Sequence, residues 1–323
     1  LDTVADVSFQ VQLPDEWDPN LAKINVGVSA VIETDICNPD WVEACNKMNA
    51  VIVPSEHAKL ALKRSGTLTS PVYVVPEWYH TQIDDQETDE TIINKDFDSN
   101  FNFLMVSQLT GNHPDTDRKN IFYTIKWFCE VFRDDPDVGL IIKTNHGKGT
   151  RIDREMTKNT LSKLLSEVRP GQFPRVHLVH GNLTPTEVSS LYKNKSVKGL
   201  ISLTRGEGFG LPILEAAASD LPVITTSWSA HTEFLSLGNY IGVDYNLIKI
   251  PESKSDGRIF IEGSKWAHPD EEDFKKRVKK FRQKNKIPKE WAEDLGVKIR
   301  DSYSKESIME KYKSVFEEII NNA

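Results

Sequence analysis

A glycine-rich turn between an expected strand and an expected helix contains the residues best suited to bind an anion. The segment reads Leu203-Thr-Arg-Gly-Glu-Gly-Phe-Gly-Leu-Pro-Ile-Leu-Glu215. Gly206, Gly208 and Gly210 let the backbone turn sharply and approach a ligand closely. Free amides at the helix start and the helix dipole favour a negative charge there. Because the segment is neither a Walker A loop nor G-x-G-x-x-G, we expect a phosphate-binding turn of another kind.

Two carboxylates flank this turn. Glu207 lies between two glycines, where stability gives little reason for an acid. Glu215 is expected in the first helical turn, where it could simply complement the helix dipole. Together the two could accept hydrogen bonds from the hydroxyls of a sugar and a ribose on either side of a diphosphate.

A cationic pair, Arg118-Lys119, stands just before an expected helix that begins at Asn120. Cations oppose the dipole at a helix N-terminus, so helix stability does not explain the pair. Neutralisation of a departing diphosphate does explain it, and plain surface charge is the alternative. Lys143, at the end of an expected strand, could face the same cleft or a solvated edge.

Two series of alternating strands and helices must position these residues, a pattern typical of parallel α/β sheets. The first has expected strands over 7–13, 24–32, 50–54 and 71–76 and helices over 39–48 and 56–64. Asn38 and Ser55 are the expected N-caps of these two helices. The second has expected strands over 102–106, 139–143, 176–179, 198–203 and 222–225 and helices over 120–132, 155–168, 186–192 and 212–219. Two further amphipathic helices are expected over 269–283 and 306–320.

An acidic stretch over 84–90 separates the two series. We therefore expect an α/β chain with two Rossmann-like domains that face a cleft, with ligands beyond the carboxyl ends of the strands. Residues 1–97 would form the acceptor-side domain and linker, and residues 98–300 the donor-binding domain. Residues 301–323 would form a C-terminal helix that packs back toward the first domain.

The composition argues against several classes of protein. No apolar run approaches the length of a membrane span, and no signal-peptide pattern follows Leu1. Residues 1–100 hold 6 basic and 18 acidic residues, which disfavours a nucleic-acid surface, whereas the remaining 34 basic and 30 acidic residues allow an anionic ligand or plain surface charge. Neither the three cysteines nor the eight histidines have metal-site spacing, so we expect no metal, no cofactor and a cytoplasmic protein.

The string GEGFGLPILEAAASDLPVI, with Glu207 and Glu215 eight residues apart, resembles the signature of the group 1 glycosyl transferases. These are retaining GT-B enzymes, family four in the usual classification. The resemblance is strong over 101–240 and fainter over 20–78, and it implies a shortened first domain. Glu207 would contact the donor sugar and Glu215 the nucleotide ribose. The backbone along the diphosphate and sugar would be that of Gly208, Phe209, Gly210 and Leu211.

The same resemblance suggests further contacts. His180, Asn182 and Leu183 follow a strand where relatives hold the base through backbone groups, although His180 could instead be an ordinary loop histidine. Gln108 stands where the family usually has an arginine, and Arg118 would compensate for it. The remaining candidates, for the acceptor or the donor sugar, are Glu33, Thr34, Asp35 and His231, with helix capping as the alternative for the two acids of the first domain.

The predicted function is a retaining, metal-independent transferase of the hexosyltransferase type, with Glu207, Arg118 and Lys119 as its catalytic residues. It would move a sugar from a nucleotide diphosphate donor, with UDP or GDP, to an unidentified acceptor. A hydrolase or epimerase acting on nucleotide sugars is one alternative. A non-catalytic nucleotide-sugar binding module is the other, because the first domain is short. Neither nucleic acid nor a membrane is expected as a partner, and the oligomeric state is not predicted.

Overall fold

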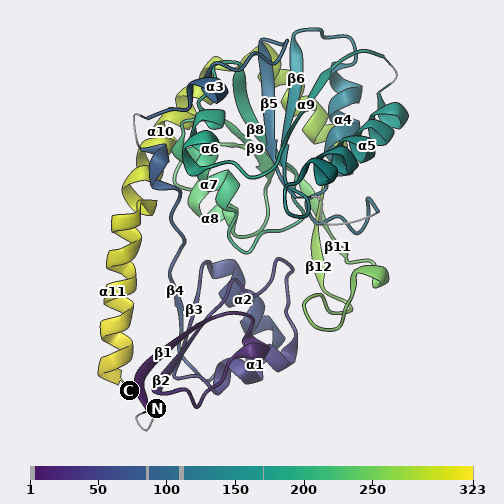
Figure 1. The fold of residues 1–323 in the computed structure, drawn as a ribbon. Helices are drawn as coiled ribbons and strands as arrows, with labels where there is room; N and C mark the ends of the chain where they lie inside the picture. Colours follow the sequence, from purple (N-terminus) through teal and green to yellow (C-terminus); the bar gives the residue numbers. More distant parts are fainter. Residues whose placement is uncertain (1–3, 85–86, 109–112, 170, 323) are drawn as a thin grey trace.

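Two separate parallel sheets organise the chain, one in each half, as Figure 1 shows for the computed structural model. The structure describes residues 4–84, 87–108, 113–169 and 171–322. The predicted α/β class with two parallel-sheet domains is confirmed. The first domain lies below the second in this view, and the linker between them contains a 3-10 turn (Thr81–Ile83) and α3 (Glu90–Ile93).

The first sheet has four parallel strands in chain order, β1 (Ala5–Val11), β2 (Ala22–Val28), β3 (Ala50–Val53) and β4 (Val72–Val74). A 3-10 turn (Pro14–Glu16) lies between β1 and β2, and α1 (Pro39–Asn46) and α2 (Glu56–Ser65) follow β2 and β3. The side chains of Asn38 and Ser55 accept hydrogen bonds from the N–H groups of Asp40 and Ala58. Both helices are therefore capped as the sequence predicts.

The second strand ends earlier than predicted. The apolar run 24–32 was expected to be one strand, but β2 stops at Val28. The chain then turns, with Val31 in the left-handed region at φ 59° and its N–H donating to Ser29 Oγ at 3.2 Å. Ile32 is buried without being in a strand. Glu33 therefore lies one turn beyond the strand rather than directly at its end.

The second sheet has six parallel strands in the order β10-β9-β8-β5-β6-β7. The strands are β5 (Phe101–Val106), β6 (Val138–Thr144), β7 (Arg175–His180), β8 (Val197–Ser202), β9 (Val223–Thr226) and β10 (Ile241–Val243). The connecting helices are α4 (Ile121–Phe132), α5 (Arg151–Val168), α6 (Pro185–Tyr192), α7 (Leu211–Ala218) and α8 (His231–Leu235). The order reverses between β5 and β8, so the loops after these strands diverge and leave room for a ligand.

Alternate residues of β5 enter different cores, as a strand buried on both faces requires. Phe103 packs with Phe128 and Phe281, whereas Leu104 packs with Ile141 and Leu214 on the other face. Complete burial of each such side chain stabilises the fold by about 1.5–3 kcal/mol. These two cores hold the strand ends that carry the predicted site in fixed positions.

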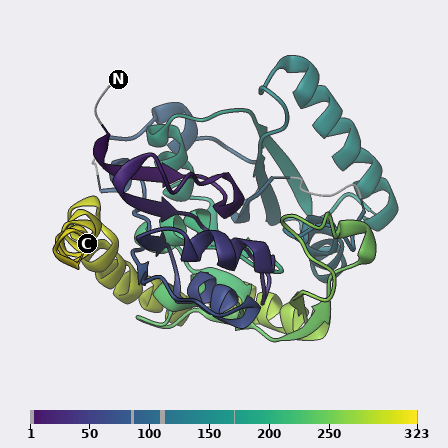
Figure 2. The same cartoon turned by 90° about the horizontal axis from the view of Figure 1, so that it is seen from below.

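Three helices close the chain, α9 (Glu271–Gln283), α10 (Lys286–Tyr303) and α11 (Lys305–Asn322). The sequence analysis missed α10 and placed only the other two. In Figures 1 and 2, α11 runs from the second domain along the outside of the first. There Ile308 and Ile319 pack with Val26 and Ile52 of the first sheet.

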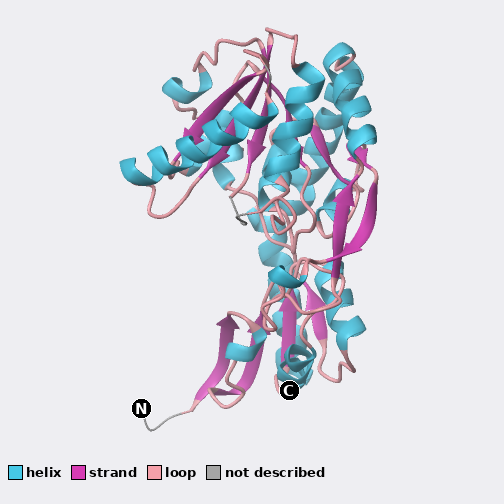
Figure 3. Ribbon diagram, turned by 90° about the vertical axis from the view of Figure 1, so that its right-hand side faces the viewer, coloured by secondary structure: helices cyan, strands magenta, loops and turns pink. Residues whose placement is uncertain are grey.

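A two-stranded arm, residues 244–270, also crosses from the second domain to the first (Figures 1 and 3). It consists of antiparallel β11 (Tyr245–Lys249) and β12 (Lys265–Pro269), joined by a loop with a 3-10 turn (Glu252–Lys254). Phe260 and Trp266 of the arm share a core with Trp17 and Trp41 of the first domain. A segment that the sequence analysis assigned wholly to the donor domain thus fastens the two domains together.

The described helices include none with the length and apolar character needed to cross a membrane. The three cysteines, Cys37, Cys45 and Cys129, are buried and unpaired.

Candidate functional site

Residues from the loops that follow two strands, β5 and β8, meet at the point where the strand order reverses. Lys119, which lies between β5 and α4, has its Nζ 2.7 Å from Oε1 and 2.9 Å from Oε2 of Glu207, which follows β8. Arg118 Nη1 lies 3.3 Å from Glu207 Oε2. The structure therefore brings together the three residues that the sequence analysis chose as catalytic, although 88 positions separate Lys119 from Glu207.

The environment of Glu207 keeps it ionised. Its burial alone would raise the pKa of the carboxyl group, because a charge is poorly solvated there. The positive charges of Lys119 and Arg118 outweigh this effect and lower the pKa of Glu207 to about 2. At neutral pH the side chain is thus a carboxylate, which can only accept hydrogen bonds.

Arg118 also contacts the first domain. Its Nη2 lies 3.2 Å from Oε1 of Glu33, and its Nη1 donates to the Gly206 carbonyl at 2.6 Å. Burial disfavours the charge of Arg118, but Glu207 and Glu33 more than compensate, so the pKa of the guanidinium is raised. Glu33 and Glu207 therefore share one arginine across the domain boundary.

Asp117 offsets the positive charge that Arg118 and Lys119 place at the start of α4. Its carboxylate accepts the N–H of Lys119 at 3.0 Å and that of Ile121 at 2.6 Å. This caps α4 with a negative charge and offsets the unfavourable dipole of the two neighbouring cations.

Arg205 holds the loop that carries the two cations, and the sequence analysis missed it. It is 1% exposed, and its guanidinium donates to the carbonyls of Asp117 at 3.2 Å and Pro114 at 3.3 Å. The backbone N–H of Arg205 donates to the Arg118 carbonyl at 2.8 Å. The only signal in the sequence is an arginine inside a turn of small residues, which does not reveal its partners.

The glycines of the turn allow the two domains to approach closely, and they also allow the turn itself. A Cβ at Gly206 would lie 2.0 Å from the carbonyl oxygen of Glu33, so only glycine fits. Gly210 has φ 102° and precedes α7, a conformation that glycine adopts without strain. Ser55 of the first domain donates to the Gly208 carbonyl at 2.8 Å.

The backbone at the start of α7 offers hydrogen-bond donors. Within the described part of the chain, no acceptor is found for the N–H groups of Gly208, Phe209, Gly210 and Leu211. Phe209 itself is buried against Phe234 and Tyr303, which fixes the turn. Donors at a helix start are suited to bind an anion.

A cavity of about 370 Å³ opens beside these groups. Its lining includes Gln108, Arg118, Lys119, Lys143 and Pro212. Lys143 Nζ donates to the Gly181 carbonyl at 2.6 Å, and its burial lowers its pKa. Three cations around one cavity suit an anion such as a diphosphate.

Glu215 lies farther along α7, as its fifth residue rather than in the first turn. Its carboxylate accepts the hydroxyl of Tyr192 at 3.1 Å and lies 3.5 Å from His80 Nε2. Burial raises the pKa of Glu215, and His80 partly offsets this effect. Because Glu215 lies beyond the first turn and is buried, compensation of the helix dipole explains it poorly. The structure does not bring Glu215 into the Lys119–Glu207 cluster.

The predicted base-contact residues lie at the carboxyl end of β7. His180 has a buried Nε2 with no partner among the described residues, and burial lowers its pKa. Asn182 Oδ1 accepts a hydrogen bond from Asn145 Nδ2, and Asn145 lines the cavity. Leu183 packs against the second-domain core.

All four residues proposed to contact the acceptor or the donor sugar have partners within the protein, and that of Glu33 is Arg118. Thr34 is fully buried and donates to the Ile36 carbonyl, and Asp35 pairs with the backbone of Lys265 in the arm. His231 is fully buried, with Nε2 2.8 Å from the Thr226 carbonyl oxygen. Their placement gives no support to those contacts, whereas Glu33 is 26% exposed at the site.

Glu233, close to His231, caps a helix of the other domain. Its carboxylate accepts the N–H groups of Glu56 at 2.9 Å and His57 at 2.8 Å, at the start of α2. In the described residues, no group of three or more His, Cys, Asp or Glu is arranged to hold a metal ion.

Comparison with known proteins connects this site to a family. Residues 113–253 match the family described as "Glycosyl transferases group 1", a segment that includes Arg118, Lys119, Glu207 and Glu215. Among curated proteins, none matches the sequence.

Solved structures share the fold at low sequence identity. A variant of S. aureus TarM in complex with Fondaparinux, alpha-GlcNAc-glycerol and UDP superposes with a TM-score of 0.60 at 17% identity, over 91% of this chain and 50% of TarM. Sucrose-phosphate synthase from Thermosynechococcus elongatus gives 0.69 at 12% identity, over 98% of this chain and 74% of that one. Anabaena HepE in complex with UDP and glucose gives 0.61 at 13%, over 96% and 71%.

The chain thus spans about half the length of TarM. Residues 113–253 thus match the group 1 glycosyl transferases, and the chain as a whole shares the fold of GT-B glycosyltransferases, with a shorter first domain.

Proposed function

We propose that this protein transfers a sugar from a nucleoside diphosphate sugar to an acceptor, with retention of configuration at the anomeric carbon. The observation that carries the proposal is the cavity lined by Arg118, Lys119 and Lys143 beside the start of α7. Because TarM and HepE were solved with UDP, a uridine nucleotide is the first donor to test.

In this proposal the diphosphate lies among the three cations and the unpaired N–H groups of Gly208 to Leu211. Glu207, ionised at neutral pH, accepts hydrogen bonds from hydroxyls of the donor sugar. The Lys119 ammonium group then donates hydrogen bonds to both Glu207 and the diphosphate. Glu215, which Tyr192 orients, would accept the hydroxyls of the ribose.

The proposed chemistry breaks the bond between the anomeric carbon and the leaving phosphate oxygen. Negative charge develops on the diphosphate, where fixed cations stabilise it without reorganisation. The acceptor oxygen bonds to the carbon on the face that the diphosphate leaves, and its proton passes to a phosphate oxygen. Since protein cations neutralise the leaving group in this scheme, we propose that turnover needs no metal ion.

The test is a panel of UDP and GDP sugars with candidate acceptors, in which NMR reports the anomeric configuration of the product. We expect transfer with retention, unchanged by a chelator. Glu207→Gln should lower kcat/KM by about 10²–10³, a range typical for the loss of one polar group that stabilises a transition state. Glu310→Gln, at an exposed position, is the control and should behave as the wild type.

Three other outcomes would overturn the proposal. Free sugar without transfer would indicate a hydrolase, and an epimerised donor would indicate an epimerase. Tight nucleotide binding without turnover across the panel would indicate a binding module.

A further inference from the structure

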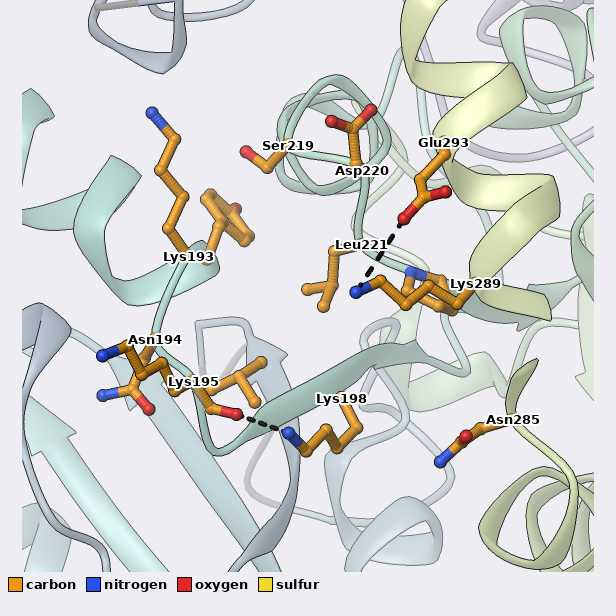
Figure 4. A pocket seen from close by; sticks show the side chains of 13 residues that line it. Lys193, Asn194, Lys195, Lys198, Ser219, Asp220, Leu221, Asn285, Lys289 and Glu293 are labelled. Atoms are coloured by element: carbon orange, nitrogen blue, oxygen red, sulfur yellow. Dashed lines mark hydrogen bonds and ion pairs between the residues drawn. The ribbon is translucent and has the colours of Figure 1, made fainter. Parts of the chain in front are cut away.

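A second cavity, of about 630 Å³, is larger than the one beside Lys119 and lies at the opposite end of the second sheet. Its walls are the turn before β8, the turn between α7 and β9, and the beginning of α10 (Figure 4). It therefore faces the amino ends of β8 and β9, whereas the site described above lies at carboxyl ends. We call it the rear pocket.

Lysines dominate the charge of the rear pocket. Lys195 and Lys198 come from the turn and first residues of β8, and Lys289 comes from α10 (Figure 4). In the described part of the chain, no carboxylate lies within ion-pair distance of Lys195 or Lys198, and Lys198 donates to the Lys195 carbonyl. Partial burial and the neighbouring charge of Lys289 lower the pKa of Lys198. Like charges are thus held around one cavity with little compensation.

The two acids of the rear pocket do not cancel this charge. Asp220 already pairs with Arg300, 2.8 Å from its Nη1. Glu293 lies 3.8 Å from Lys289 and partly offsets that single ammonium. The pocket therefore keeps an excess of positive charge that a bound anion would neutralise.

The beginning of α10 adds to the positive potential of the rear pocket. Asn285 precedes the helix and lines the pocket, but its side chain makes no capping hydrogen bond. The first turn of this 18-residue helix contains no acid, so the positive end of its dipole is uncompensated. Two separate segments, the turn before β8 and the beginning of α10, thus present positive charge to one cavity.

The geometry points to a second ligand site, in which Lys198, Lys289 and the start of α10 bind a phosphate-bearing small molecule. The volume is within the range of small-molecule pockets. Tyr192 lines the rear pocket and also donates its hydroxyl to Glu215, the residue proposed above to bind the ribose.

Calorimetric titration with inorganic pyrophosphate tests the proposal. Every sample, including the parent, carries Lys119→Gln in the chain described above, so that binding beside Glu207 is weakened throughout. Adding Lys198→Gln and Lys289→Gln together should weaken the remaining pyrophosphate binding about tenfold or more, the effect of losing charge-assisted hydrogen bonds. The matched control adds Lys158→Gln and Lys313→Gln, two exposed lysines outside the pocket, and should bind like the parent.

Equal affinity of the rear-pocket pair and the control pair would overturn the proposal, as would the absence of pyrophosphate binding by the parent. Lys198→Arg with Lys289→Arg should retain binding, because the charge is kept. If the double Gln variant does not fold, the two single variants decide the question by the same comparison. Because no readout depends on transferase activity, failure here is distinguishable from failure of the proposed function.

Discussion

Glu33 of the first domain lies 3.2 Å from Arg118 Nη2 of the second domain, and Glu207 lies 3.3 Å from Nη1 of the same guanidinium. Two carboxylates thus compete with any bound diphosphate for one arginine. Arg118 thus connects an acid of the first domain with an acid of the second domain at the site.

Removing the charge of Glu33 should tighten nucleotide binding. In Glu33→Gln, the Arg118 guanidinium pairs with one carboxylate instead of two, and the site contains one negative charge fewer. We expect UDP to bind about two- to fivefold more tightly, since a partly exposed ion pair contributes about 0.2–1 kcal/mol. Titration calorimetry measures this. Asp35→Asn, in the same loop but paired with the arm, is the control, and weaker binding by Glu33→Gln would contradict this interpretation.

The low pKa of Glu207 makes stability depend on pH in a defined window. A carboxyl group with a pKa of about 2 in the folded state and an ordinary value near 4.5 when unfolded stabilises the fold above pH 4.5. That contribution, on the order of 3 kcal/mol, is lost as the pH falls from about 4.5 toward about 2. Urea unfolding of Glu207→Gln should therefore show a shallower pH dependence there than the wild type. Parallel pH profiles for the two proteins would refute the assignment.

The cap that Glu233 places on α2 should be measurable at two amides. Glu233→Ala removes the acceptor for the N–H groups of Glu56 and His57. We expect faster hydrogen exchange at these amides and a loss of about 1 kcal/mol in the free energy of unfolding, typical of a lost cap. Glu310→Ala provides the control. Unchanged exchange at both amides would show that the cap does not hold the domains together in solution.

Arg205 should affect both stability and ligand binding. Arg205→Met leaves the carbonyls of Asp117 and Pro114 without their buried donor and loosens the loop that carries Lys119. We expect unfolding to become easier by about 2–4 kcal/mol and nucleotide affinity to fall. Arg133→Met, at an exposed position, should change neither. A variant at Arg205 with normal nucleotide affinity would mean that the loop keeps its position without this arginine.

The sequence was informative where local chemistry determines structure. Ser55 and Asn38 cap their helices as predicted, because a cap depends on a few neighbouring residues. The glycine-rich turn follows β8 and the Arg118-Lys119 pair immediately precedes the α4 N-cap, as the sequence indicated, and the two meet because a parallel sheet gathers the loops that follow its strands on one edge.

Contacts between distant segments could not be predicted in this way. Nothing near Asp35 in the sequence indicates Lys265 as its partner, and the need for glycine at position 206 comes from the carbonyl of Glu33. The helix α10 was missed because Pro288 and many charged residues obscure the helical spacing of Ala292, Leu295 and Ile299. In the structure α10 packs against α7. Pro288 is tolerated because it lies in the first turn.

The central claim is that the cations beside Glu207 bind a nucleoside diphosphate. Calorimetric titration of UDP and GDP into the wild type, Lys119→Gln and the exposed control Lys158→Gln tests it most directly. The expected result is binding of at least one nucleotide by the wild type and the control, and affinity lower by about tenfold or more in Lys119→Gln. Equal affinities in all three proteins, or binding of neither nucleotide, would contradict the claim.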